Sequence, residues 1–231
     1  VLRSLITPLP SRVSLSWHGT LDAMQLNLSS EEVLTSTRSV RKRLDFDKPV
    51  ERKIVEECLE IALQAPTGGN SQGWHWIVVE DAAKKKALAD IYRANWAIYS
   101  SLPSGKPRGD VRDEQLPKVR DSATFLAENF EKAPMLMIPC IDGRLENLDV
   151  FSGAGAWGSL LPAVWSFMLA LRGRGMGSAW TTIHLMMDGE KKAAELLGIP
   201  YDKITQGGLF PIAYTIGTAF KAANRLPLDK V

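Results

Sequence analysis

The hydrophobic and polar positions of the chain follow two periods, one typical of helices and one typical of short strands. Between Pro49 and Ala65 apolar residues recur every three or four positions, and Pro66-Thr67-Gly68-Gly69 ends the pattern. Comparable signals predict further helices at 29–37, 81–99, 115–130, 152–172 and 188–198. Aromatic and β-branched runs predict strands at 74–80, 134–140 and 208–217, with 179–184 a loop or strand and 100–115 a mobile loop. With no repeat and no linker, we expect a single domain over 24–231, rich in helix with three or four short strands.

The segment from Phe151 to Leu171 contains no charged residue and is long enough to span a bilayer. Its glycines and serines, together with Pro162, dilute its hydrophobicity, and no other segment of the chain resembles it. We therefore expect no membrane span. The preferred interpretation is a helix buried on all sides by protein at a subunit interface.

Residues 1–23 differ in composition from the rest of the chain. They contain two prolines, several serines and two arginines, and no acidic residue before Asp22. This composition faintly resembles a transit peptide, but the preferred interpretation is a leader or a poorly ordered extension before Met24.

Bulk composition narrows the classes of function. A net charge of +2 over 231 residues gives no general attraction for nucleic acid or anionic lipid. Cys58 and Cys140 lie far apart and are predicted to be buried reduced thiols, so a reducing, cytoplasmic location is expected. The histidines have no spacing typical of metal ligands, and no metal site is predicted; they are His18, His75 and His184.

The first chemical candidate is the basic run from Arg38 to Arg43, which reads Arg-Ser-Val-Arg-Lys-Arg. It is compatible with a solvated surface. It also suits a phosphate, because guanidinium groups grip phosphate oxygens bidentately and Ser39 can add a hydrogen bond. Asp45 and Asp47 follow at once and weaken a polyanion-binding interpretation.

The second candidate is the run 66–74, Pro-Thr-Gly-Gly-Asn-Ser-Gln-Gly-Trp, between a helix and a strand. It could simply be a helix stop and a turn. A turn, however, does not need Thr67, Asn70 and Gln72 beside a tryptophan. Glycines let backbone approach a flat ring, and side-chain amides can pair with the polar edge of an isoalloxazine.

The third candidate is the run 173–182, Gly-Arg-Gly-Met-Gly-Ser-Ala-Trp-Thr-Thr. Its glycines close a helix instead of opening one, which excludes a Rossmann dinucleotide fingerprint. Gly175 and Gly177 are predicted to form helix-ending turns. The chain contains neither a Gly-x-Ser-x-Gly elbow nor a P-loop.

Taken together and in this order, the three runs resemble those of the nitroreductase family, as does the ending Arg225-Leu226-Pro227-Leu228. The resemblance extends from Met24 to Val231. It implies an intertwined homodimer with an α+β fold, a central and mostly antiparallel sheet flanked by helices, and two FMN sites at the dimer interface.

The resemblance also implies which residues bind FMN. Arg41 would lie near the N1/O2 edge, where a cation stabilises the anionic reduced flavin. The residues implied at the phosphate and ribityl end are Arg38, Ser39 and Arg225. Those implied to line the ring from the other subunit are Pro66, Thr67, Gly68 and Asn70. Val40 and Gln72, in the same two runs, are also implied to bind the cofactor. Those implied along the opposite side of the ring are Trp180, Thr181 and Thr182.

The implied activity is ping-pong transfer of hydride from NAD(P)H to nitroaromatics, quinones or similar small acceptors, with no catalytic side chain because the flavin carries the chemistry. The alternatives are other flavin chemistry on the same fold (reductive dehalogenation, enone reduction, flavin breakdown) and a non-catalytic FMN storage or sensing protein. Gly73 stands where the family often has proline. The stretch 92–118 does not clearly supply the Glu-Tyr-Lys group of the dehalogenase branch. Four cations are either surface charges or contacts for the 2′-phosphate of NADPH: Arg93, Lys106, Arg108 and Arg112.

Overall fold

The structure is a computed structural model that describes residues 25–103 and 105–231, so the expectations for residues 1–23, including His18, lie outside the described residues. The helices are α1 (Ser30–Ser36), α2 (Arg52–Ala62), α3 (Ala82–Ser101), α4 (Val111–Asn129), α5 (Val150–Gly173) and α6 (Gly189–Leu197). The strands are β1 (Leu44–Asp45), β2 (Trp74–Val79), β3 (Met135–Asp142), β4 (Met176–Ser178), β5 (Ile204–Gln206) and β6 (Phe210–Thr215).

The strands form one sheet, with β1, β6, β3 and β2 in that order, β4 paired with β6 and β5 paired with β3. Every pairing between named strands is antiparallel. β2 lies along β3 from Trp74 opposite Ile141 to Val79 opposite Leu136. The expected α+β fold with a central antiparallel sheet is confirmed.

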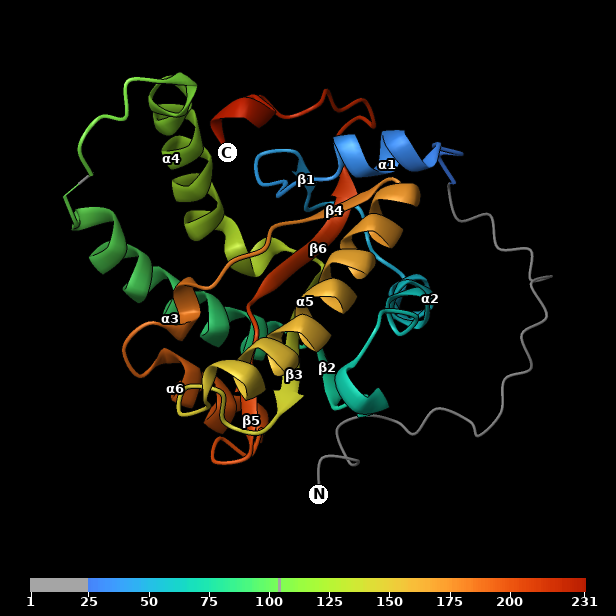
Figure 1. Ribbon diagram of the computed structural model, residues 1–231, viewed down its shortest axis with the longest axis vertical. Helices are drawn as coiled ribbons and strands as arrows, with labels where there is room; N and C mark the ends of the chain where they lie inside the picture. The colour runs from blue at the N-terminus through green and yellow to red at the C-terminus, as the bar shows by residue number, and fades with distance from the viewer. Residues whose placement is uncertain (1–24, 104) are drawn as a thin grey trace.

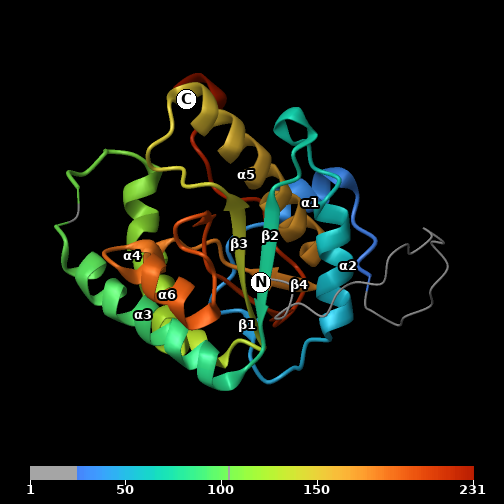
Figure 2. The same cartoon turned by 90° about the horizontal axis from the view of Figure 1, so that it is seen from below.

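Helices cover both faces of this sheet (Figures 1 and 2). β3 is apolar along almost its whole length because its side chains alternate between two cores. Met135, Met137 and Ile141 belong to the core beneath α2 and α5. Leu136 and Ile138 belong to the core beneath α3, α4 and α6. The result is a three-layer arrangement with the sheet in the middle.

Local signals in the sequence explain several helix ends. At α1 the Ser29 hydroxyl accepts from the Glu32 amide at 3.2 Å, and the Glu32 carboxylate accepts from the Ser29 amide at 2.7 Å. Asp81 caps α3 by accepting from the Lys84 amide. Gly198 ends α6 in the left-handed conformation, at φ 70°.

Two boundaries differ from those predicted. α4 begins at Val111, four residues before the predicted start at 115, because Asp110 caps it there by accepting from the Arg112 amide. Gly175 does make the predicted turn, at φ 68°. Gly177, in contrast, lies inside the unpredicted strand β4, so its assignment to a turn was wrong.

α5 is the apolar helix expected from the sequence. By length and hydropathy alone it is long and apolar enough to cross a membrane. One face of α5 packs on α2 and the sheet, as expected for a core helix. Within one protomer the helix is not buried on all sides, so burial at a subunit interface stays a prediction. Phe151 is 88% exposed and Leu161 is 39% exposed on the outward face.

Both cysteines are buried free thiols, as predicted. Cys58 lies in the core beneath α2, where burial raises the pKa of its thiol to about 12. Cys140 lies in β3, where burial also raises the pKa. Both side chains therefore remain protonated near neutral pH.

Candidate functional site

The first and third runs of the sequence lie side by side in the structure. Ser39 forms a parallel bridge with Ser178 at the end of β4. The Val40 amide donates to the Ser178 carbonyl at 2.8 Å. The Ser39 hydroxyl accepts from the Trp180 amide at 3.2 Å, although the two residues are 141 positions apart in the chain. The sheet therefore holds the Arg38–Arg41 segment against the 178–182 segment.

Gly177 makes this close approach possible. A Cβ atom at position 177 would lie 2.8 Å from Thr215 Cγ2 and 3.1 Å from Val40 Cγ2. Only a glycine lets β4 fit between β6 and the basic segment without displacing one of them. The glycine is needed for packing, not for a turn.

Three arginines surround the ring of Phe220, which follows β6. The guanidinium carbons of Arg38, Arg43 and Arg172 lie 5.9, 4.0 and 5.0 Å from the ring centroid. We call these three residues the arginine cluster. Arg225 lies near enough to act electrostatically on Arg38. The structure therefore brings together two cations that the sequence predicted to bind the FMN phosphate, although they lie far apart in the chain.

The members of the arginine cluster differ in how they are bound. Arg43 donates to the carbonyl oxygens of Ile216, Gly217 and Ala219 at 2.8–2.9 Å, and so fastens the chain after β6. Arg172, 6% exposed at the end of α5, donates to the Ser36 hydroxyl and the Thr218 carbonyl. Arg38 makes one long contact of 3.4 Å, with the Ser36 carbonyl.

The cluster carries positive charge that nothing nearby neutralises. Desolvation by burial, followed by repulsion from neighbouring arginines, lowers the pKa of Arg38 and of Arg172. No carboxylate among the described residues forms an ion pair with the cluster. Arg38 Nη2, Arg172 Nη1 and Ser178 Oγ are buried without a hydrogen-bond partner and border the same small cavity. Buried N–H groups without partners, in an excess of positive charge, are what an anionic oxygen ligand requires.

A cleft of about 500 Å³ lies beside the basic segment, between the end of α3, the start of α4 and the 180–183 segment. Its walls include four aromatic side chains: Tyr92, Trp96, Tyr99 and Trp180. Arg41 and the two threonines at 181 and 182 also line it. Four of the sequence-predicted site residues thus border one cleft of the size that small-molecule sites have.

Arg41 is the cation at the inner wall of the cleft. Burial lowers the pKa of its guanidinium, while the nearby Tyr92 hydroxyl acts in the opposite direction. Burial raises the pKa of Tyr92 to about 12, so its phenol stays protonated and can donate a hydrogen bond at neutral pH. No acidic residue in the described part of the chain pairs with Arg41. The inner wall therefore presents a permanent positive charge beside a neutral donor.

The segment 180–182 is held rigidly on the opposite side. Thr181 pairs with Leu209 through its backbone, and its hydroxyl donates to the Leu209 carbonyl at 2.6 Å. The Trp180 ring packs on Phe210 with centroids 5.4 Å apart. Thr182 is exposed toward the cleft.

The second run does not join these residues within the protomer. The loop 66–72 lies against the first half of α5, where the Gly68 amide donates to the Ser159 hydroxyl at 2.9 Å. From Ser159 to Arg172 the helix rises about 20 Å, so the loop and the arginine cluster lie toward opposite ends of α5 (Figure 1). Its predicted side chains are mostly exposed, and Gln72 donates to Asn70 at 2.9 Å.

The departure at Gly73 has a structural reason. A Cβ atom at position 73 would lie 3.0 Å from an Asp142 carboxylate oxygen. The other oxygen of Asp142 lies 2.8 Å from His75 Nε2. The Asp142 amide also donates to the Gly73 carbonyl at 2.9 Å. A small residue at 73 thus allows the Asp142–His75 contact that joins the ends of β2 and β3.

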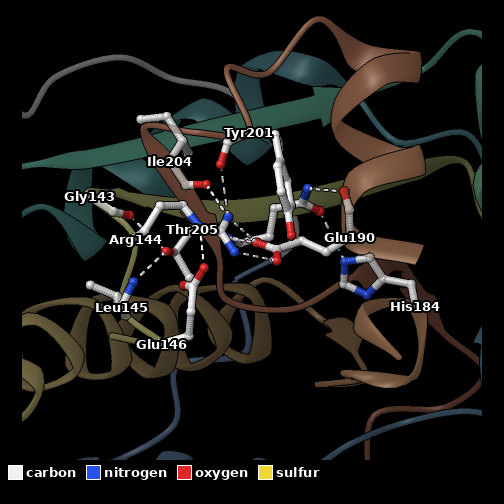
Figure 3. A network of polar contacts seen from close by, with 10 residues as sticks. Gly143, Arg144, Leu145, Glu146, His184, Glu190, Tyr201, Ile204 and Thr205 are labelled. Atoms are coloured by element: carbon white, nitrogen blue, oxygen red, sulfur yellow. Dashed lines mark hydrogen bonds and ion pairs between the residues drawn. The ribbon is translucent and has the colours of Figure 1, made fainter. Parts of the chain in front are cut away.

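A second polar network contains none of the residues that line the cleft, and it joins elements of the fold (Figure 3). Arg144 forms two 2.9 Å contacts with the Glu190 carboxylate and also donates to the carbonyls of Tyr201 and Ile204. His184 Nε2 lies 3.2 Å from the Gln206 side-chain oxygen, and complete burial lowers the pKa of this imidazole to about 4. The network joins β5, α6 and the loop after β3. No group of three potential metal ligands occurs among the described residues.

Sequence reasoning missed three contributors to the site: Arg172, Tyr92 and Trp96. Arg172 was overlooked because it follows the long uncharged helix, although a lone cation at the end of an apolar helix is itself a signal of a buried charge. Tyr92 and Trp96 were read only as part of a helix. Their spacing of four places both on one helix face, which here borders the cleft.

The fold and the site together define a class of protein: an α+β domain with an arginine cluster that no described carboxylate pairs with, and an aromatic cleft of the size that small-molecule sites have. The profile of the nitroreductase family matches residues 34–214. The chain therefore belongs to the nitroreductase family.

Individual similarities agree with this assignment. Nitrobenzene nitroreductase of Ectopseudomonas oleovorans is 25% identical over 195 residues, which cover 73% of this chain and 80% of that protein. The FMN and NADPH-dependent nitroreductase NfnB from sphigopyxis sp. strain HMH superposes with a TM-score of 0.64 at 24% identity, covering 88% of this chain and 97% of that one. Iodotyrosine deiodinase bound to FMN and 3-iodo-L-tyrosine gives a TM-score of 0.64 at 18% identity, with 86% and 96% covered.

Proposed function

We propose that this protein is an FMN-dependent oxidoreductase that takes electrons from NAD(P)H and passes them to a small aromatic or quinonoid acceptor. The observation that carries the proposal is the arginine cluster. Its buried, unpartnered N–H groups border a small cavity, and Arg41 of the same basic segment lines the aromatic cleft. Related proteins support it, since one is a nitrobenzene nitroreductase and another is an FMN and NADPH-dependent nitroreductase.

The residues present fit FMN. Arg38 would bind the phosphate, with Arg225 and the Ser39 hydroxyl beside it, because the cluster has cations in excess and an unpartnered Arg38 Nη2. Val40 would act indirectly, by fastening the basic segment to β4. Arg41 would stabilise negative charge at the N1/O2 edge. The chemistry that FMN supplies when bound is two-electron transfer between a nicotinamide and an acceptor.

The cleft would serve donor and acceptor in turn, which is the physical basis for a ping-pong scheme. Its aromatic walls suit planar rings, and the rigid 180–182 segment would position them. One NAD(P)H and one proton together deliver two electrons and two protons. These convert a quinone to a hydroquinone, or a nitro group to a nitroso group with release of water. Thr182 and the Tyr92 phenol are two of the O–H groups that line the cleft and would pass a proton; Tyr99 and Ser100 are others.

We further propose that the functional unit is a homodimer that pairs through α5. The outward face of α5 carries Phe151, Gly155, Gly158 and Leu161 and no charge, and so forms an apolar strip on the protomer surface. Pairing two such helices in opposite directions would carry the 66–72 loop of one protomer toward the arginine cluster of the other. A Phe151→Glu variant should then sediment as a monomer and lose FMN. A dimer that persists would overturn this interface.

The cytoplasmic location is also part of the proposal, because both cysteines are buried free thiols. Dehalogenation remains the second candidate, because the iodotyrosine deiodinase structure shares the fold. The described lining of the cleft contains Tyr99 and Lys106 but no glutamate, so the observations favour the reductase.

The deciding experiment is a visible spectrum of the purified protein, followed by anaerobic addition of NADH or NADPH. We expect flavin absorbance that bleaches with one or both donors and returns when a quinone or nitroaromatic is added. Flavin that resists both donors would support a storage or sensing role instead. A colourless protein that takes up no added FMN would refute the proposal.

A further inference from the structure

The cations near the cleft fall into two groups. Arg93 is neutralised by Asp90 at 2.6 Å and by Glu131 at 2.7 Å. Arg112 is neutralised by Asp110 at 2.6 Å. Neither arginine lines the cleft. Both arginines therefore belong to ion pairs at the surface.

Lys106 and Arg108 differ in both respects. Both line the cleft, on the segment between α3 and α4. Neither side chain forms an ion pair in the part of the chain that the structure describes, although Asp110 lies near enough to act electrostatically on Arg108. Of the four cations that the sequence offered as phosphate contacts, these two alone combine an unpaired charge with a position in the cleft wall.

The one acidic residue in the cleft wall is already engaged. The Asp113 carboxylate accepts from the backbone amides of Arg108 and Gly109 at 2.8 and 2.7 Å. These hydrogen bonds lower the pKa of Asp113, which keeps it ionised. Its role is to hold the segment so that residue 108 faces the cleft, and the charge of the lining stays strongly positive.

The lining of the cleft combines an excess of positive charge with aromatic surface. The lining contains one acidic residue, Asp113, and four basic ones: Arg41, Lys106, Arg108 and Arg120. Arg120 also donates to the Ser100 carbonyl at 2.9 Å, which joins α4 to the end of α3. Between the cations lie aromatic rings, including Trp96 and Tyr99 with centroids 5.7 Å apart. Low-dielectric aromatic walls concentrate the field of charges of one sign, which favours an anionic occupant.

We propose that the physiological acceptor is a planar aromatic compound that carries an anionic group, namely a carboxylate, sulfonate or phosphate. The ring lies between the aromatic walls, and Lys106 and Arg108 bind the anionic group. This inference rests on the proposed reductase function and deepens it by naming the class of acceptor.

The test compares two acceptors that differ in charge but little in shape, 4-nitrobenzoate and 4-nitrobenzamide. The variants are Lys106→Gln, Arg108→Gln and the double variant. Lys118→Gln is the matched control, because it removes one positive charge from an exposed position of α4 that does not line the cleft. We expect kcat/KM for 4-nitrobenzoate to fall about threefold per charge, as for a solvent-accessible ion pair, and about tenfold in the double variant, mainly through KM. The values for 4-nitrobenzamide and for the control should change less than twofold.

Two results would overturn the inference while leaving the reductase function intact. The first is an equal loss for both acceptors in the double variant. The second is a loss confined to NADPH, measured as the rate of anaerobic flavin bleaching with NADPH and NADH, which would assign the two cations to the donor's 2′-phosphate.

A binding measurement keeps the inference separate from turnover. Benzoate and benzamide are titrated into the oxidised protein, and the shift of the flavin spectrum is recorded. We expect tighter binding of benzoate, which weakens in the double variant and at high salt. If the protein bleaches with neither donor, the reductase function fails, but benzoate selectivity still reports on the cleft. Equal affinity for the two ligands would refute the anionic class.

Discussion

Replacing Arg38 by glutamine tests the arginine cluster most directly, because this side chain contributes little to the fold. Its contacts within the protomer are one 3.4 Å hydrogen bond to the Ser36 carbonyl and a distant approach to the ring of Phe220. Its neighbours Arg43 and Arg225 repel it. Loss of the charge relieves that repulsion, so we expect the free energy of unfolding of the apoprotein to change by less than about 0.5 kcal/mol.

The effect on cofactor binding should be far larger. Charge-assisted hydrogen bonds to an anion contribute about 1.5–3 kcal/mol, and each 1.4 kcal/mol is a factor of ten. The Arg38→Gln variant should therefore bind FMN about 10- to 100-fold more weakly. Riboflavin lacks the phosphate, so its affinity should stay within about twofold. Titration of the apoprotein with either flavin, followed by fluorescence quenching, measures both constants.

The matched control is Lys42→Gln, which removes a charge from the same basic run. Lys42 is exposed and contacts Asp121 at the surface, away from the cluster. Its FMN affinity should be unchanged. The reasoning is refuted if Arg38→Gln weakens FMN and riboflavin equally, or if FMN affinity is retained.

Three further predictions concern stability, measured by urea unfolding of the apoprotein. Arg43→Gln should cost about 2–3 kcal/mol, because it removes three hydrogen bonds to the segment after β6; a loss below 0.5 kcal/mol would contradict this. Gly177→Ala should cost about 1–3 kcal/mol, because the new Cβ would lie 2.8 Å from Thr215 Cγ2; unchanged stability would show that the strands can separate freely. Burial lowers the pKa of His184 to about 4, below its value in the unfolded chain, so its stabilisation is complete above pH 6.5 and is lost as the pH falls toward 4. Between pH 7.5 and pH 5 the loss should be about 2 kcal/mol, and a His184→Gln variant should lack that part of the pH dependence.

The long helices could be predicted because each carries a repeated signal. α2, α3, α5 and α6 have either an apolar face or a capping residue at the predicted end. β1, β4 and β5 are two or three residues long, and so short a strand contains no full period of alternation. They form because longer neighbours, β6 and β3, offer them free backbone groups. That is a property of the folded sheet, not of the short segments.

The site was predictable to the extent that its chemistry lies in contiguous runs. Arg38–Arg41 and 180–182 were found as separate patterns, and β4 brings them together. Arg172 could not be found in this way, because its role depends on α5 ending beside Ser36 and Phe220. Likewise, nothing in the spacing of Lys106 and Arg108 distinguishes them from Arg112. The distinction arises from Asp110, which forms an ion pair with Arg112 and with neither of the other two.

The loop 66–72 shows what a protomer alone leaves unexplained. Its positive backbone angles at two non-glycine residues, φ 55° at Asn70 and 50° at Gln72, cost conformational energy. Yet the loop is exposed, and its amide side chains bond to one another instead of to the core. The outward face of α5 poses the same question, because Phe151 is 88% exposed on an uncharged strip. Both features lie at the same end of the same helix. In the proposed dimer, a second copy of the chain packed on that strip would bury Phe151 and bring the loop toward the partner's FMN site, so a single interface would account for both.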